Sequence, residues 1–367
     1  MQFHVGTRKG LFTYEKNSQG WEITHVDFLG DNVSMLLHDR RDETLYAGLN
    51  LGHFGAKLRR SSDAGKNWDE LTPPSFPEGE TVPIPQFDGS EAKQKPASLS
   101  EIWSLEAGSD DQLGLLWAGT IPAALFSSKD RGDSWELNDS LWNLPERQQW
   151  FGGGKDESGV HSISVDPRDS KHITIAISCG GVWQTTDLGV TWSCRSDGMR
   201  AEYMPPDRQF DPVIQDPHRL VRCPAAPDNF WVQHHNGIFK STNNCEKWEE
   251  LTAEPSSFGF GVAVHPNDPK TAWFVPGVKD EVRVPVDGKL IVTKTEDGGG
   301  TFESLSAGLP QSHSYDIVYR HALEVDDSGE LLIFGTTTGN LFVSENGGES
   351  WECLSTTLPP IYVVRFA

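Results

Sequence analysis

Short apolar strands recur along the chain, each followed by a second strand and a polar turn. Apolar segments that end near Gly or Thr are LYAGL within 44–49, LLWAGT at 115–120, HITIAIS at 172–178, FWVQHH at 230–235 and LLIFGTT at 331–337. Second strands follow, as in GVWQTT at 181–186 and NLFVSE at 340–345. Runs of β-branched and aromatic residues bounded by turn residues predict hairpins. The pattern therefore predicts an all-β protein with almost no helix.

The turn after each hairpin repeats one short phrase. It reads SSDAGKNW from 61, SKDRGDSW from 128, TTDLGVTW from 185 and SENGGESW from 344, with weaker copies STNNCEKW from 241 and TEDGGGTF from 295. In this phrase the Asp and Ser or Thr side chains accept hydrogen bonds from the turn, Gly supplies a positive φ, and Trp packs between sheets. The repeat is therefore structural.

The spacing of the repeat predicts a β-propeller. Successive copies lie between 67 and 49 residues apart, and a four-stranded propeller blade takes about 40–50 residues. Strands at 3–21 lack an innermost partner, and IYVVRFA at 361–367 has no blade of its own. Pairing the two would close the sheet edges. We predict one seven-bladed propeller over 1–367, with inserts 72–100, 138–160 and 196–213 on the ligand face.

The repeated phrase resembles the Asp-box, or BNR repeat, of sialidases and other propellers. VGTRKGLF at 5–12, GHFG at 52–55, FGFGVAVHP at 258–266 and the final Arg365 resemble a bacterial branch catalogued as glycosyl hydrolases or exo-sialidase-like proteins. This resemblance implies the propeller fold, and its activity label comes from the repeat alone.

Sialidase chemistry is not expected. Retaining sialidases need three Arg, a Tyr nucleophile with a Glu, and an acid Asp. The Arg motif that precedes the first Asp-box is missing here, and the similar RVP at 283–285 lies between late strands. The three arginines that would have to bind the carboxylate, Arg8, Arg320 and Arg365, are scattered along the sequence.

The net charge limits the kinds of partner that the protein is expected to bind, and the cysteine content indicates its cellular compartment. A net charge of −22 argues against nucleic acid and anionic membranes, which both need clustered cations. The sequence has no run of 18 apolar residues and no signal-peptide pattern at its start. Five widely spaced cysteines without a CxxC motif indicate reduced thiols. We expect a cytoplasmic protein.

The expected inner strands align several metal-binding side chains. Laying VHSISVDP at 160–167 over PHRLVRCP at 217–224 puts His161 level with His218, and the overlay extends to His321 and Glu101. Residues at one level of the inner strands would face one channel. Imidazole and carboxylate are ligands of Zn²⁺, Fe²⁺ and Mn²⁺. The sequence therefore predicts a divalent transition metal held by these four residues.

Two other interpretations of these side chains stay open. The histidines would form a metal-free polar site, or their alignment is a coincidence, because a one-residue slip turns a side chain to the other face. Around a metal, Glu101 would act as a ligand or as the base for its water, while His53 and His235 would face the substrate. Five aromatic residues of the inserts either pack within their own loops or form the hydrophobic entrance of a ligand site. They are Trp142, Trp150, Phe151, Tyr203 and Phe210.

These features favour a metal-dependent hydrolase or lyase that acts on a small molecule. The rival hypothesis is a non-catalytic scaffold that binds a protein or a glycan. Long inserts and aligned histidines favour the enzyme, whereas an exposed apolar patch would favour the scaffold. The substrate and the oligomeric state do not follow from the residues.

Overall fold

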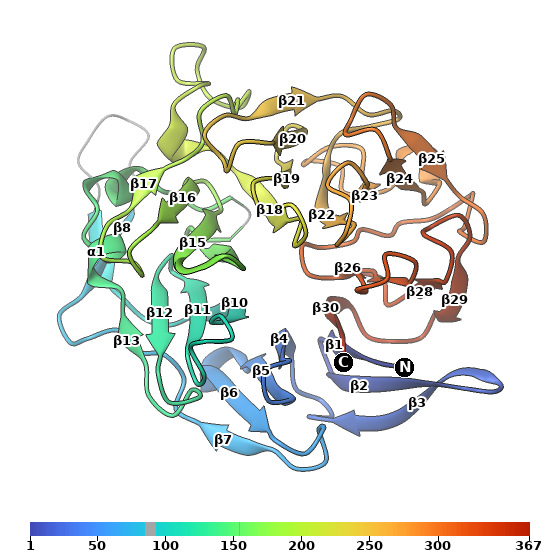
Figure 1. The fold of residues 1–367 in the computed structure, drawn as a ribbon, viewed down its shortest axis with the longest axis horizontal. Helices are drawn as coiled ribbons and strands as arrows, with labels where there is room; N and C mark the ends of the chain where they lie inside the picture. The colour runs from blue at the N-terminus through green and yellow to red at the C-terminus, as the bar shows by residue number, and fades with distance from the viewer. Residues whose placement is uncertain (85–92, 154) are drawn as a thin grey trace. The chain divides into compact units, whose positions relative to one another are not determined.

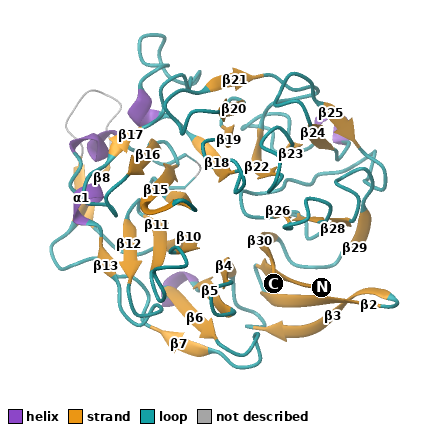
Figure 2. Cartoon of the chain, viewed as in Figure 1, coloured by secondary structure: helices purple, strands orange, loops and turns teal. Residues whose placement is uncertain are grey.

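The computed structural model describes residues 1–84, 93–153 and 155–367, and it contains seven four-stranded sheets (Figure 1). Within the sheets the paired strands are antiparallel and follow one another in the chain, with one exception at the termini. The sequence prediction of an all-β seven-bladed propeller is confirmed. Figure 2 shows how little helix accompanies the strands. Residues 85–92 of the first insert and Gly154 of the second lie outside the described residues.

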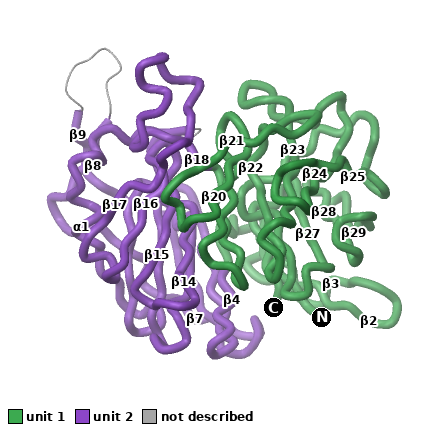
Figure 3. Tube along the Cα trace, turned by 45° about the horizontal axis from the view of Figure 1, so that its top comes forward, with its two compact units in different colours: residues 1–36, 218–367 green, residues 37–217 purple. Residues whose placement is uncertain are grey.

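The chain separates into two compact units, which Figure 3 colours differently. Unit 1 comprises residues 1–36 and 218–367, and unit 2 comprises residues 37–217. The blades of unit 1 are β1 Gln2–Thr7, β2 Gly10–Asn17 and β3 Gly20–Asp27 with β30 Ile361–Phe366; β18 Pro217–Arg222, β19 Phe230–His234, β20 Ile238–Ser241 and β21 Glu249–Leu251; β22 Gly259–Val264, β23 Ala272–Pro276, β24 Val292–Thr295 and β25 Glu303–Leu305; and β26 Leu323–Val325, β27 Leu332–Gly335, β28 Leu341–Ser344 and β29 Glu352–Ser355.

Unit 2 carries the remaining three blades and all three long inserts. Its sheets are β4 Val33–Asp39, β5 Thr44–Asn50, β6 Ala56–Ser61 and β7 Asp69–Leu71; β10 Glu101–Ala107, β11 Leu116–Ile121, β12 Leu125–Ser128 and β13 Glu136–Leu137; and β14 Val160–Asp166, β15 Asp169–Ile177, β16 Gly181–Thr185 and β17 Ser193–Cys194. The hairpin β8 Thr81–Ile84 and β9 Lys93–Pro96 belongs to the first insert.

The helices are short and lie in loops. They are α1 Asp139–Trp142 and the 3-10 helices η1 Gly52–Phe54, η2 Pro145–Gln149, η3 Pro212–Ile214 and η4 Val286–Gly288. Among the described residues, none of these helices has the length and apolar character needed to cross a membrane.

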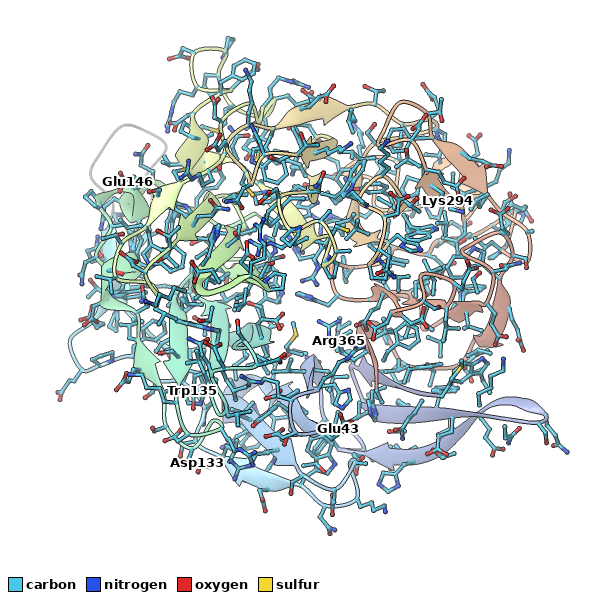
Figure 4. The ribbon with its side chains drawn as sticks, viewed as in Figure 1. Glu43, Asp133, Trp135, Glu146, Lys294 and Arg365 are labelled. Carbon is cyan, nitrogen blue, oxygen red and sulfur yellow. The ribbon has the colours of Figure 1, made fainter. Side chains whose placement is uncertain are left out.

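The carboxy-terminal strand completes the amino-terminal blade. β30 pairs antiparallel with β1, with Phe3 opposite Phe366 and Val5 opposite Val364. The side chains of Ile361, Val363 and Val364 are fully buried. Arg365 on the same strand, labelled in Figure 4, lies 3.7 Å from the carboxylate of Glu324. The pairing buries apolar surface and removes a sheet edge at once, as the sequence predicted.

The Asp-box turns are closed by side chains. In the copy at 185–192, Asp187 Oδ1 accepts hydrogen bonds from Thr185 Oγ1 at 2.7 Å and from the N–H of Thr191 at 2.9 Å. The Thr185 hydroxyl also accepts from the N–H of Gly189 at 2.8 Å. Gly189 has a φ of 82°, which only glycine adopts without strain. These bonds satisfy backbone donors that would otherwise have no partner in the turn.

Hydrogen bonding lowers the pKa of the Asp-box carboxyl groups. Donation from Thr191, and then from Thr185, lowers the pKa of Asp187 to about 2. Asp63, Asp130 and Asp297 in three other copies have a pKa of about 2 for the same reason. In two further copies an asparagine, Asn243 or Asn346, makes the equivalent bonds through its Oδ1.

Removing residues 361–367 should abolish cooperative unfolding. Without β30, strand β1 would lose its hydrogen-bonded neighbour and the apolar cover of Phe3 and Val5. Circular dichroism melting would then show a broad transition in place of a sharp one. Deletion of Ala367 alone is the control, because that residue is exposed. A truncated protein with the parent melting temperature would contradict the role of this pairing.

The Asp-box carboxylates should make the fold sensitive to acid. Their pKa of about 2 lies below the ordinary value of 3.8, so the unfolded chain takes up protons first as the pH falls. The stabilisation is therefore present above about pH 5 and is lost as the pH falls toward 2. Urea midpoints measured from pH 6 to pH 2.5 would record this loss.

Asp187→Asn and Asp187→Ala separate the contribution of the turn's hydrogen bonds from that of the carboxylate charge. The asparagine should keep the turn, as Asn243 and Asn346 do, but reduce the proton uptake on unfolding by about one near pH 3. The alanine should lower the urea midpoint at every pH, because the donors of Thr185 and Thr191 lose their acceptor. An unchanged pH profile in the asparagine variant would rule this explanation out.

Candidate functional site

His218 stands near the start of strand β18 and is held in one tautomer. Its Nδ1 lies 2.7 Å from the carbonyl oxygen of Gly259, and a carbonyl only accepts, so Nδ1 carries the proton. The lone pair of the ring is therefore on Nε2. The side chain is 1% exposed. An N–H donated to a backbone carbonyl is the support that metal-binding histidines usually have, because it fixes the ring orientation.

Glycine is required where this carbonyl approaches the imidazole. The ladder between β22 and β23 is irregular between Gly259 and Val262. A Cβ atom on Gly259 would lie 2.9 Å from the carbonyl oxygen of Val275 and 3.2 Å from Oε1 of Gln233. An irregularity of this kind redirects backbone groups out of the ladder. The local path of β22 thus presents an acceptor to His218.

Aromatic rings pack around His218. The Phe260 ring stacks on it, with 4.5 Å between centroids and 13° between planes, and Phe258 meets it edge-on. His235, in the loop between β19 and β20, is half-buried, and its ring centroid lies 5.6 Å from that of His218. Two imidazoles therefore meet in an apolar setting within unit 1.

A carboxylate joins these two histidines. Asp216 stands two residues before His218, so the path of the chain keeps the two side chains close together. One potential ligand atom each of Asp216, His218 and His235 lies within 4.8 Å of the others. Asp216 is 1% exposed. Two histidines and one carboxylate are a recurrent ligand set for Zn²⁺ and Fe²⁺, so these three residues form a candidate metal centre.

Asp216 is positioned by residues that follow strand β15. Its Oδ1 accepts hydrogen bonds from Ser178 Oγ and from the N–H of Cys179, both at 3.0 Å. Cys179 has a φ of 47°, in the left-handed region that is costly for a residue other than glycine. A Cβ atom on Gly153 would lie 3.0 Å from Oδ2 of Asp216. The second insert therefore passes directly over this carboxylate.

Tyr203 of the third insert keeps its proton beside this group. Its hydroxyl donates to the carbonyl oxygen of Ile214 at 2.9 Å. Loss of solvent around the hydroxyl, and then the negative charge of Asp216, raise the pKa of Tyr203. The residue as a whole is nevertheless 37% exposed. Tyr203 is therefore a neutral hydrogen-bond donor at neutral pH.

Two of the predicted ligands lie in unit 2. Glu101, at the start of β10, accepts hydrogen bonds from Lys155 Nζ at 3.0 Å and from Asn50 Nδ2 at 3.3 Å. His161 is fully buried on β14 and meets the Trp103 ring edge-on at 5.6 Å. The ladders of both strands are irregular at this level, around Trp103 in β10 and around His161 in β14. The metal roles of Glu101 and His161 stay predictions.

The other two predicted residues occupy different settings. His321 precedes β26, and its Nδ1 lies 2.9 Å from Nη1 of Arg219. Because a guanidinium only donates, Nδ1 accepts this hydrogen bond, and the proton of the neutral ring is on Nε2. His53 lies in η1 with its ring against that of Phe54, at 3.9 Å between centroids. The roles predicted for His321 and His53 are not tested by this arrangement.

The structure thus brings together His218 and His235 and adds a residue that the sequence analysis missed. Asp216 had a detectable signal, because residues two apart on a strand share a face. An aspartate at that spacing before His218 in QDPH is visible in the sequence. It was missed because the alignment of inner strands began at Pro217.

Comparisons with known proteins support the fold. No family model matches the chain. A curated relative, the xyloglucanase Xgh74A of Acetivibrio thermocellus, is 35% identical over 71 residues, which are 19% of this chain and 8% of the enzyme. The matched part therefore spans less than a tenth of that relative's length.

Solved structures match nearly the whole chain at low identity. The GH74 xyloglucanase from Xanthomonas campestris superposes with a TM-score of 0.56 at 16% identity, over 96% of this chain and 46% of the enzyme. A functionally unknown protein from Desulfotomaculum acetoxidans superposes with a TM-score of 0.55 at 12% identity, over 99% and 98%. Ycf48 bound to D1 peptide gives 0.51 at 15% identity, over 84% and 78%. The chain thus shares its propeller fold with GH74 and Ycf48 structures.

Proposed function

We propose that this protein is a metal-dependent hydrolase that acts on a small molecule, with its metal bound by Asp216, His218 and His235. The observation that carries the proposal is the convergence of these three side chains within 4.8 Å. The relation to GH74 propellers is consistent with a hydrolase, although some relatives, such as Ycf48, are described only as binding a peptide.

The three side chains suit a divalent transition metal in two respects, the negative charge of Asp216 and the unprotonated ring nitrogen of His218. His218 presents Nε2 because Gly259 fixes its Nδ1–H, and Asp216 supplies the negative charge. Zn²⁺ sites that catalyse hydrolysis commonly use three protein ligands and keep a further position for water. The half-buried His235 places the group within reach of solvent.

A metal at this position would lower the pKa of its bound water to about 7. The residues of this chain would then orient the reactants. The Phe258 and Phe260 rings exclude water from one side of His218, and the Tyr203 hydroxyl stays protonated near Asp216. In hydrolysis the leaving group takes a proton. Tyr203 is one neutral donor near Asp216 that would be available for this.

Elemental analysis of protein purified without added metal should find close to one transition-metal ion per chain. His218→Gln and Asp216→Asn should each weaken metal binding by about tenfold or more, since loss of even a supporting contact costs that much. Added Zn²⁺ should raise the melting temperature of the parent protein but not that of these variants.

His161→Gln is the matched control, because it removes another buried histidine from outside the group. It should retain the metal if Asp216, His218 and His235 bind it, and it should lose the metal if the aligned inner strands bind it. A parent protein with less than about a tenth of an equivalent of metal, and with no Zn²⁺-induced stabilisation, would refute the metal proposal. A hydrolase substrate panel with and without chelator then tests the activity.

A non-catalytic scaffold is the second candidate, and a groove in unit 2 favours it. This groove has a volume of about 670 Å³, and its apolar lining includes Leu115, Trp117 and Leu188. Leu113 and Val190 beside it are 70% and 69% exposed. Exposed apolar side chains around a groove are typical of binding surfaces. A protein that carries no metal but retains a partner in solution would favour this function.

A further inference from the structure

A separate cavity lies between the inserts of unit 2. It measures about 240 Å³, and its lining comes from the hairpin β8–β9, the β11–β12 loop and residues within 147–152 and 156–158. Its walls are mostly apolar: Val82, Ala123 and Trp150 are 3%, 3% and 2% exposed. A space of this size takes a compact organic molecule, since drug-sized ligands fill about 300–1,000 Å³.

Arg147 brings a buried positive charge to this cavity. It is 7% exposed and lies on η2, beside Glu146, which Figure 4 labels. Its guanidinium stacks on the Trp142 ring, with Cζ 3.3 Å from the centroid, and donates to the carbonyl oxygens of Thr81 at 2.9 Å and Trp142 at 3.4 Å. Burial lowers the pKa of Arg147 to about 10, and the charge of Glu80 opposes this effect. The group is therefore still cationic at neutral pH.

The charge of Arg147 is incompletely compensated. Among the described residues, no carboxylate lies within ion-pairing distance of it, and Glu80 acts only at longer range while accepting from the Trp142 indole. A buried cation without a paired anion is costly, and such groups are usually paired. An anion from outside the chain would supply the missing partner.

Trp150 forms part of the same wall and is 2% exposed. Its indole Nε1 is buried, and no described residue accepts a hydrogen bond from it. Because Nε1 has almost no accessible surface, this N–H does not face the open space of the cavity. Arg147 is therefore the buried cationic donor of the cavity, within mainly apolar walls.

The rim of the cavity is polar and carries one more acidic than basic group. Lys95 Nζ lies 2.6 Å from a carboxylate oxygen of Glu157, and Asp156 next to it is exposed. These two acidic residues disfavour an anion of high charge, because a single buried guanidinium balances only one negative charge. The lining thus matches an apolar body that carries one planar anionic head.

We propose that this cavity binds a small aromatic or branched aliphatic monocarboxylate, with the carboxylate held by Arg147. A carboxylate has two acceptor oxygens in one plane, which suits the edge of a guanidinium group. The ring or branched chain would pack against Val82, Ala123 and Phe151. This inference goes beyond the proposed function and does not depend on it, because binding alone tests it.

Calorimetric titration of the full chain, after chelation to remove any metal that would itself bind carboxylates, tests the proposal. Benzoate should bind one site per chain, with a Kd on the order of 1 mM or tighter. Benzamide, which has the same shape without the charge, and phenyl phosphate should each bind about tenfold more weakly or worse. No saturable benzoate binding, or equal affinity for benzamide or phenyl phosphate, would overturn the assignment.

Three variants place the ligand in this cavity. Arg147→Met should weaken benzoate binding by about tenfold or more, because it removes a charged donor. Trp150→Phe keeps an aromatic ring in the wall and removes only an indole N–H that does not face the cavity, so it should leave the benzoate affinity nearly unchanged. Ala123→Leu fills the space without touching either donor and should abolish binding.

The controls cover loss of folding and nonspecific charge effects. Arg131→Met removes an arginine whose side chain is 50% exposed and lies outside the cavity, so it should leave the benzoate affinity unchanged. If Arg147→Met does not fold, Ala123→Leu and the comparison of benzoate with benzamide still decide the question. Undiminished benzoate affinity in folded Ala123→Leu would show that the ligand binds elsewhere.

Discussion

Six of the seven blades depend on a turn in which one side chain satisfies several backbone donors. The inner strands of the blades are buried, but the Asp-box turns are polar and partly exposed, so a local network must hold them against water. In the copy around Asp187, the carboxylate and the Thr185 hydroxyl bind the backbone N–H groups of Thr191 and Gly189. A hydrogen bond of this kind contributes little net free energy, but its loss leaves an unsatisfied donor. The turn thus fixes where the third strand ends and where the fourth begins.

The residue requirements of these turns explain why the fold could be predicted from the sequence. The turn requires Ser or Thr, Asp or Asn, and Gly at fixed offsets, so that the phrase repeats even where the strands differ. The closing strand could be predicted for a similar reason, since IYVVRFA is rich in apolar and β-branched residues and has no partner nearby in the chain. Its pairing with β1 confirms that prediction. Local chemistry and edge protection are short-range and general constraints, and they leave clear sequence patterns.

The candidate site was less readable because it depends on irregularities in the inner strands. An overlay of sequences assumes regular alternation, yet β14 is irregular at His161 and β22 between Gly259 and Val262. One extra residue in a strand changes which face the following side chains occupy. The sequence analysis assigned His218 and His235 different roles. Their closeness in the structure depends on the loop after β19, which has no regular residue pattern. Asp216 needed knowledge of where the third insert ends.

The two proposed sites also lie at segments that are not repeated from blade to blade. Repeated segments perform one physical task in every blade, so they carry little that distinguishes one propeller from another. The buried charges that lack this structural explanation, Asp216 and Arg147, are positioned by inserts or by residues next to them. Gly153 passes over the carboxylate of Asp216, while Gly152, its neighbour in the chain, lines the cavity that contains Arg147. One insert therefore contributes to both proposed sites, and neither buried charge belongs to the repeated Asp-box turns. Such charges persist at a cost to stability, which is the physical reason to look for ligands there.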